Sequence, residues 1–388
     1  MATSLPAQST GQDHTRTQVG FGETTLRLLS TSIIGLALLA FVVGTAWDTQ
    51  WHVAVGRDRA LTAPHVMMLL GITIAGLMSL VLVLLDTWRA RQGMGVSEGN
   101  SSRVLGFFQA PAGIVLAGVG ALLAAVAFPL DDYWHTLYGV DVTLWAPFHV
   151  MIITGMVVSG AGSLFTLATE ARHSASPRQR MLLELAFAAL LAITWSALLL
   201  LLPQANADDG LFAWGSYQMV WYPILLAVAL PLITVMAQRL THLPAPATLV
   251  ALFTLAIRQI MFWFVPWAVE STRIAEGLVY RPNPPTAVIT PYALPVSILF
   301  VAVAADLAVW LVRRTDRRPW MGSAAAGVAT LLAVFVERPW SVQLTTYYFL
   351  TLDVQRTLLQ SMPLALVGAL ASLGLALAFN RSFAVARH

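Results

Sequence analysis

The chain has 388 residues, of which 57% are hydrophobic and only 11% are charged, and its formal net charge at pH 7 is +3. About a quarter of the residues in a soluble domain are charged, so this composition excludes an ordinary soluble protein. Cysteine is absent, which excludes disulfides and thiolate metal sites. We expect an all-α, polytopic integral membrane protein that lies in a lipid bilayer.

The predicted elements are apolar runs, each long enough to cross a bilayer as a helix. The polar first 25 residues are expected to form a disordered cytoplasmic tail. About ten membrane-spanning helices follow, at approximately 26–47, 64–86, 104–128, 147–168, 181–203, 213–237, 244–267, 289–313, 319–337 and 360–380. Helices are favoured over barrel strands because the runs are long and continuous.

The arginines predict the orientation, since the chain contains no lysine. With the N-terminus inside, fifteen of the 22 arginines fall on cytoplasmic segments and six on outer segments. Cytoplasmic loops of membrane proteins carry this excess of basic residues. We therefore expect a multi-pass protein of the cell membrane with both termini in the cytoplasm. The basic balance follows from this topology and gives no reason to expect nucleic-acid binding.

A short pattern occurs twice, 83 residues apart, in the first and second pairs of predicted helices. The copies run from Asp48 to Met67 and from Asp131 to Met151, and they align when Phe148 is treated as an insertion. Eleven residue types coincide, which indicates an internal repeat. The predicted divisions are a tail (1–25), a duplicated helical-hairpin unit with a candidate metal site (26–170) and a six-helix membrane region (171–388).

Each copy of the repeat carries one aspartate and two histidines, the side-chain types that bind transition metals. The first triad is Asp48, His52 and His65, and the second triad is Asp131, His135 and His149. In each triad the aspartate and the first histidine are four residues apart, which places them on one face of a helix. The sequence predicts a helix, an outer loop carrying Asp and His, and a second helix opening with His just after a proline. Two such hairpins in one orientation can pack as a four-helix bundle with the ligands near its outer end.

Two imidazoles and one carboxylate suit copper, zinc, iron or nickel as divalent ions. Converging copies would form one dinuclear site, whereas separate copies would form two mononuclear sites with open positions. Met67, Met68 and Met151 are near the ligands and could add a thioether, although packing is the commoner role of such methionines. The alternative to a metal is a structural polar network or a proton-handling site.

The Asp-x3-His-x12-His spacing of the first triad resembles the copper-site motif in the C subunit of the particulate methane and ammonia monooxygenases. In that family the motif lies at a membrane helix and supplies one Asp and two His to copper. The second triad is one residue longer between its histidines, and the resemblance covers about 18 residues per copy. It implies copper as the favoured metal, with zinc or iron as alternatives.

The region after residue 170 has no second Asp/His repeat, and one charge stands out in it. Arg258 lies inside the run 244–267, where a buried guanidinium needs a partner or water. Glu270 and Glu337, near the outer end, are the expected partners; Asp306 is placed nearer the cytoplasmic side. No phosphate-binding loop, nucleotide fingerprint or nucleophilic serine turn is present, which disfavours an ATPase.

Three classes of function fit this sequence. The first is a membrane metalloenzyme of oxidative type that acts on a small or lipophilic substrate from the outer face. The second is a copper transporter or an assembly factor for a copper enzyme. The third is a structural or channel-like membrane protein whose Asp and His side chains only form hydrogen bonds.

Overall fold

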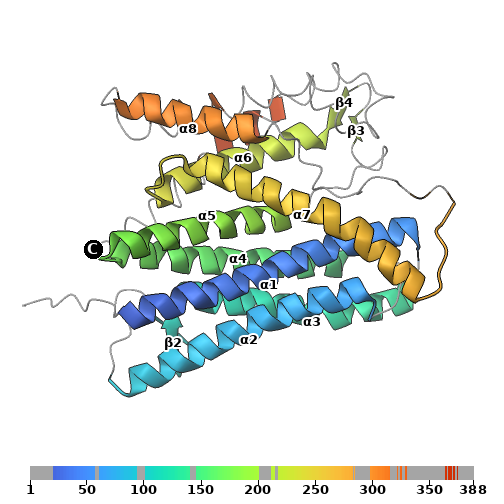
Figure 1. The fold of residues 1–388 in the computed structure, drawn as a ribbon, viewed down its shortest axis with the longest axis horizontal. Coiled ribbons are helices and arrows are strands. Elements are labelled where there is room, and N and C mark those ends of the chain that lie inside the picture. The colour runs from blue at the N-terminus through green and yellow to red at the C-terminus, as the bar shows by residue number, and fades with distance from the viewer. Residues whose placement is uncertain are drawn as a thin grey trace, which may run out of the picture.

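The computed structural model describes residues 21–56, 61–93, 101–139, 146–200, 211–214, 217–282, 284 and 298–314, with isolated residues beyond them. The helices are α1 (Phe21–Ala54), α2 (Ala63–Arg91), α3 (Ala112–Tyr138), α4 (Pro147–His173), α5 (Pro177–Leu199), α6 (Trp221–Leu240), α7 (Pro246–Ala275) and α8 (Ile298–Arg314). The strands are β1 (Ser101–Val104), β2 (Phe108–Pro111), β3 (Leu211–Trp214) and β4 (Tyr217–Val220). Figure 1 shows the long helices lying side by side along the longest axis of the molecule.

Six of the described helices, α1 to α5 and α7, are long and apolar enough to cross a membrane. This confirms the predicted class of helical membrane protein. The predicted count of ten spans is not supported by the described residues. The run 289–313 is described only from Ile298, as the shorter helix α8, and most of the expected spans 319–337 and 360–380 lies outside the described residues.

Two short antiparallel hairpins accompany the helices, and neither was expected from the sequence. β1 pairs with β2 between α2 and α3, and β3 pairs with β4 before α6. The expected spans beginning at 104 and 213 therefore start too early, because strand residues precede the helices there. The amide of Gln109 donates to Thr87 Oγ1 at 3.0 Å, which attaches the first hairpin to the end of α2.

The helices that carry the triads continue beyond the predicted apolar runs. We expected helix ends near 47 and 128, with Asp and His on an outer loop, but α1 continues to Ala54 and α3 to Tyr138. Both helices are followed by a glycine with positive φ, Gly56 at 77° and Gly139 at 86°, a conformation that ends helices and favours glycine. An apolar run marks only the part of a helix that lies in the core of the bilayer. The helix itself can continue beyond that core until a residue such as this glycine ends it.

The two N-terminal hairpins pack through small residues at equivalent positions. A Cβ on Gly71 of α2 would meet Ala37 and Phe41 of α1, and a Cβ on Gly155 of α4 would meet Gly120 and Ala124 of α3. Ala37 and Gly120 are 83 residues apart, as are Phe41 and Ala124, whereas Gly71 and Gly155 are 84 apart; these are the offsets of the sequence pattern before and after its inserted residue. Close backbone approach through small residues is a usual way for membrane helices to associate. The two hairpins therefore share one packing geometry.

Alanine at Gly120 should destabilise the α3–α4 contact. The new Cβ would collide with the backbone of Gly155 and Ser159, and overpacking of this kind costs about 1–3 kcal/mol. Alanine at Gly76 is the matched control, because its Cβ would meet Ala121 at an ordinary 3.6 Å. Thermal unfolding in detergent should show a lower midpoint for Gly120→Ala only. Equal midpoints would contradict the described helix packing.

The remaining described helices share a hydrophobic core with α1. α5 and α7 both contact α1, and one continuous hydrophobic cluster runs from Ile34 of α1 to Ala302 of α8. The core thus crosses the boundary placed at 170/171, a boundary that itself falls inside the last turn of α4. The proposed division into a duplicated unit and a six-helix region stays a prediction.

The start of α7 is capped by a side chain from α8. Asp306 accepts hydrogen bonds from the backbone amide and the hydroxyl of Thr248, both at 2.8 Å, and from Gln238 of α6 at 3.1 Å. A carboxylate there satisfies amides that have no partner within the helix. Asp306 therefore holds α6, α7 and α8 together.

Candidate metal centre

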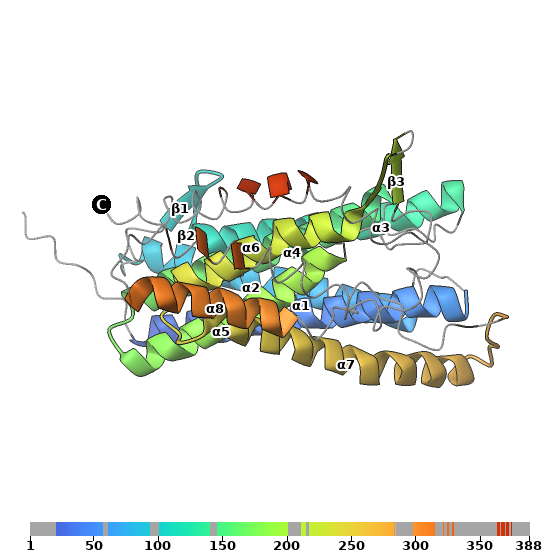
Figure 2. The same cartoon turned by 90° about the horizontal axis from the view of Figure 1, so that it is seen from above.

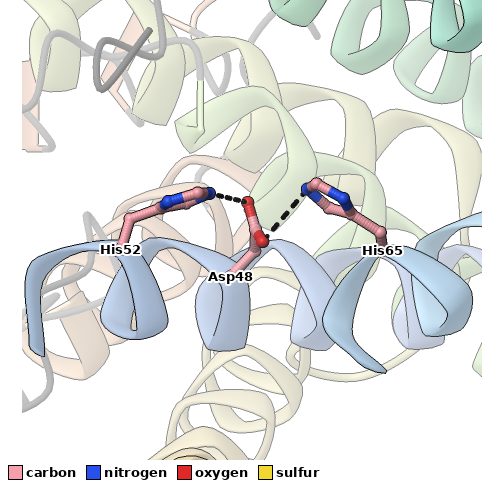
Figure 3. Close-up of side chains that lie close together, drawn as sticks. All are labelled: Asp48, His52 and His65. Carbon is pink, nitrogen blue, oxygen red and sulfur yellow. Dashed lines mark ion pairs between the residues drawn. The ribbon is translucent and has the colours of Figure 1, made fainter. Parts of the chain in front are cut away.

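The first triad lies at the end of the α1–α2 hairpin. Asp48 and His52 are on the last turns of α1, and His65 is on the first turn of α2, immediately after Pro64. Asp48 Oδ2 lies 3.5 Å from His52 Nε2, and Asp48 Oδ1 lies 3.2 Å from His65 Nε2. Figure 3 shows the carboxylate between the two imidazoles. Each carboxylate oxygen thus faces one ring nitrogen.

The second triad repeats this arrangement at the end of the α3–α4 hairpin. Asp131 and His135 lie on the last turns of α3, and His149 lies on the first turn of α4. Asp131 Oδ2 is 3.4 Å from His135 Nε2 and 3.2 Å from His149 Nε2. A single carboxylate oxygen therefore faces both imidazoles.

Both triads have the dimensions of a metal site. In each triad one ligand atom per residue lies within 4.8 Å of the others. Metal–ligand bonds of about 2.0–2.2 Å in tetrahedral geometry place neighbouring ligand atoms about 3.4 Å apart. The four O–N separations, 3.2 to 3.5 Å, match that spacing and exceed the roughly 2.7–2.9 Å of a charge-assisted hydrogen bond. Three protein ligands also leave a coordination position for an exogenous ligand.

The arrangement of the polar atoms in the triads suits a bound cation. Asp131 Oδ1 is buried and accepts no hydrogen bond, whereas Asp48 Oδ1 is buried and faces His65 Nε2 at 3.2 Å. His135 Nδ1 lies 3.2 Å from the carbonyl oxygen of Gly139, which can only accept a hydrogen bond. In a neutral imidazole this proton on Nδ1 leaves the lone pair of Nε2 directed at Asp131. A backbone partner of this kind orients metal-binding histidines, and a cation between Nε2 and the carboxylate would satisfy both groups.

The ligands are partly shielded from solvent, with side chains 14% to 23% exposed. The Phe128 ring of α3 packs edge-on against His65, with ring centroids 5.7 Å apart. The first triad therefore touches the second hairpin through Phe128. The six ligand side chains nevertheless form two groups of three rather than a single cluster.

α7 and the segment after it cover the end of α1 that carries the first triad. Trp47 packs edge-on against Phe264 of α7, with centroids 5.7 Å apart. The Arg281 amide donates to the Ala54 carbonyl at 2.9 Å, and its guanidinium donates to the Gly56 carbonyl at 3.3 Å. A residue 225 positions away thus closes over the turn that follows His52.

An ion pair beside this segment bears on the expected pairing of Arg258 with Glu270. Glu270 accepts from Arg273 at 2.7 and 2.9 Å and from the Tyr280 hydroxyl at 2.6 Å. Burial, with this hydrogen bond to Glu270, raises the pKa of Tyr280. The expected pairing of Arg258 with Glu270 is therefore wrong: the Arg258 guanidinium stacks on Phe262, 4.6 Å from its ring centroid. Glu337, the other expected partner, lies outside the described residues.

The triads lie at the same end of the bundle. α1 and α3 end there, and α2 and α4 begin there, as the two views in Figures 1 and 2 show. The structure thus brings each sequence-predicted triad together. It also reveals a buried group that the sequence analysis missed, the Arg27 cluster at the opposite end, formed by Glu23, Arg27, Asp86 and Glu170. The available signal was the presence of charged residues at the ends of apolar runs.

Comparison of the chain with protein-family models, with curated proteins and with solved structures found no match. The resemblance to the monooxygenase subunit therefore rests on the triad spacing alone.

Proposed function

We propose that this protein is an integral membrane metalloprotein that holds one transition-metal ion, with copper favoured, in each Asp–His–His triad. The observation that carries the proposal is the repeated spacing of oxygen and nitrogen atoms, 3.2 to 3.5 Å in both triads. Two mononuclear sites are favoured over one dinuclear site, because the ligands form two separate groups.

The incomplete ligand set favours an enzyme. Structural zinc sites are closed by four protein ligands, whereas catalytic sites keep a position for water or substrate. An open copper site in a membrane suits oxidation of a small or lipophilic substrate that enters from the bilayer or from the outer face. We therefore propose a membrane metalloenzyme of oxidative type.

Metal transport is the second candidate, and the distribution of ligands disfavours it. A transport path needs further sites through which the ion can pass across the bilayer. Among the described residues, only the two triads, both at one end of the bundle, offer three or more such ligands within reach of one another. This arrangement favours an ion that stays bound at the triads over an ion that is transported across the membrane.

Elemental analysis of the full-length protein, purified after growth with copper, zinc and iron, tests this proposal. We expect about two ions per chain, one for each three-ligand site. Ascorbate reduction followed by reoxidation in air would then show whether bound copper is redox-active. Purified protein without a bound transition metal, and without uptake of added copper, would overturn the proposal and favour a structural role for the triads.

A further inference from the structure

The Arg27 cluster contains a buried ion pair between α1 and α2. Arg27 Nη1 lies 2.6 Å from Asp86 Oδ2, and Arg27 Nη2 donates to Asp86 Oδ1 at 2.8 Å. Both side chains are 1% exposed. In this bidentate contact the positive charge of Arg27 neutralises the negative charge of Asp86.

Two further carboxyls share this single guanidinium. Glu23 Oε1 lies 3.3 Å from Arg27 Nη2, and the Glu23 side chain is 17% exposed, so it retains contact with solvent. Glu170 of α4 is only 8% exposed, and its Oε2 is buried and accepts no hydrogen bond. The Thr24 hydroxyl is the side-chain hydrogen-bond partner of the Glu170 carboxyl. Of the three carboxyls around Arg27, Glu170 therefore has the fewest contacts that would stabilise a negative charge.

The neighbouring helices supply little additional positive charge to Glu170. The charged groups that act on it are Arg27 and Glu23 of α1 and His173 of α4. His173 is exposed, and its Nδ1 is held by the Thr169 carbonyl at 2.8 Å.

Two further helices, α5 and α3, pack against α4 and are considered for their charged groups. On α5, the Glu184 carboxylate is bound to His242, and Arg180 donates to the Ser174 carbonyl. The adjoining part of α3, residues 112–130, contains no titratable residue.

A charge balance follows from these contacts. One guanidinium neutralises one carboxylate, and a second buried carboxylate beside that pair would be an uncompensated charge in a water-poor site. The cost of such a charge is large enough that the group takes up a proton instead. Intramembrane ionisable groups in this situation are frequently proton relays.

We propose that Glu170 is a proton-binding site whose carboxyl is protonated at neutral pH and exchanges this proton with solvent at its end of the bundle. Glu170 and His149 are 21 residues apart on α4, or about 30 Å by helix rise. This distance is about the thickness of the hydrocarbon core of a bilayer. The exchangeable proton and the metal triads therefore lie at opposite membrane surfaces.

Infrared spectroscopy of the full-length protein in lipid, titrated from mildly acidic to mildly alkaline pH, tests the proposal. A protonated carboxyl gives a carbonyl absorption that is separate from that of a carboxylate and shifts in heavy water. We expect this absorption in the wild type at neutral pH and its loss in Glu170→Gln. Glu184→Gln is the matched control, since Glu184 is also buried but holds His242 through hydrogen bonds of 2.9 and 2.8 Å. The control should keep the absorption.

Glutamine has nearly the shape of a protonated glutamic acid, so Glu170→Gln should fold and elute as the wild type does. Absence of the carbonyl absorption in the wild type at neutral pH would overturn the proposal, as would an unchanged absorption in Glu170→Gln. Failure of Glu170→Gln to fold would overturn it too, because a neutral isostere would then not replace the native group. None of these outcomes depends on metal occupancy of the triads.

Discussion

Alanine in place of His52 should reduce the metal content from about two ions per chain to about one, since a site left with two protein ligands loses its ion. The second triad draws its three ligands from another hairpin, so it should stay loaded. The fold should survive, because its stability comes from the packing of apolar helices. Elemental analysis of the purified variant gives the ratio.

The matched variants sharpen this test. His135→Ala should also leave about one ion, and the double variant should leave none. His173→Ala is the control, because His173 lies at the opposite end of α4 and is held by a backbone carbonyl. Loss of both ions from either single variant would indicate one coupled dinuclear site. Retention of both ions would show that the triads are not the metal sites.

The candidate site was predictable from sequence because its geometry is local. Asp48 and His52 are one helical turn apart, so any helix through them brings their side chains to one face. His65 follows His52 by 13 residues, and Pro64 is suited to the first turn of the second helix. Repetition of this pattern in the second triad, with one residue inserted between the histidines, separated the signal from chance. The contacts within each triad therefore followed from spacing alone.

Contacts between distant segments could not be predicted in this way. The placement of Arg281 on the turn after His52 joins segments 225 residues apart, and nothing in either segment indicates the other. Hydropathy gave the class of membrane protein but placed the ends of α1 and α3 too early. Of the two expected partners of Arg258, Glu270 was wrong, because its position near the outer end of the same helix does not show which side chains it contacts; Glu337 lies outside the described residues.

The Arg27–Asp86 pair should be the most sensitive ionic contact among the described residues. Arg27→Gln leaves Asp86 buried at 1% exposure without its cation, and breaking a buried pair in this way costs about 3–5 kcal/mol. Thermal unfolding in detergent should therefore show a large decrease in the midpoint. Arg273→Gln is the control: its contact with Glu270 is equally short at 2.7 Å, but Glu270 is 45% exposed, so solvent replaces the lost partner.

A double variant, Arg27→Leu with Asp86→Leu, connects this prediction to the state of Glu170. Removing both partners of a buried ion pair leaves no unpaired charge, and such replacements are often neutral. If Glu170 is protonated, the double variant removes equal and opposite charges and should recover most of the stability lost in Arg27→Gln. If Glu170 were ionised, it would lose its nearest cation in both variants and the double variant would remain unstable. The unfolding midpoints thus test whether Glu170 is protonated, independently of the infrared absorption.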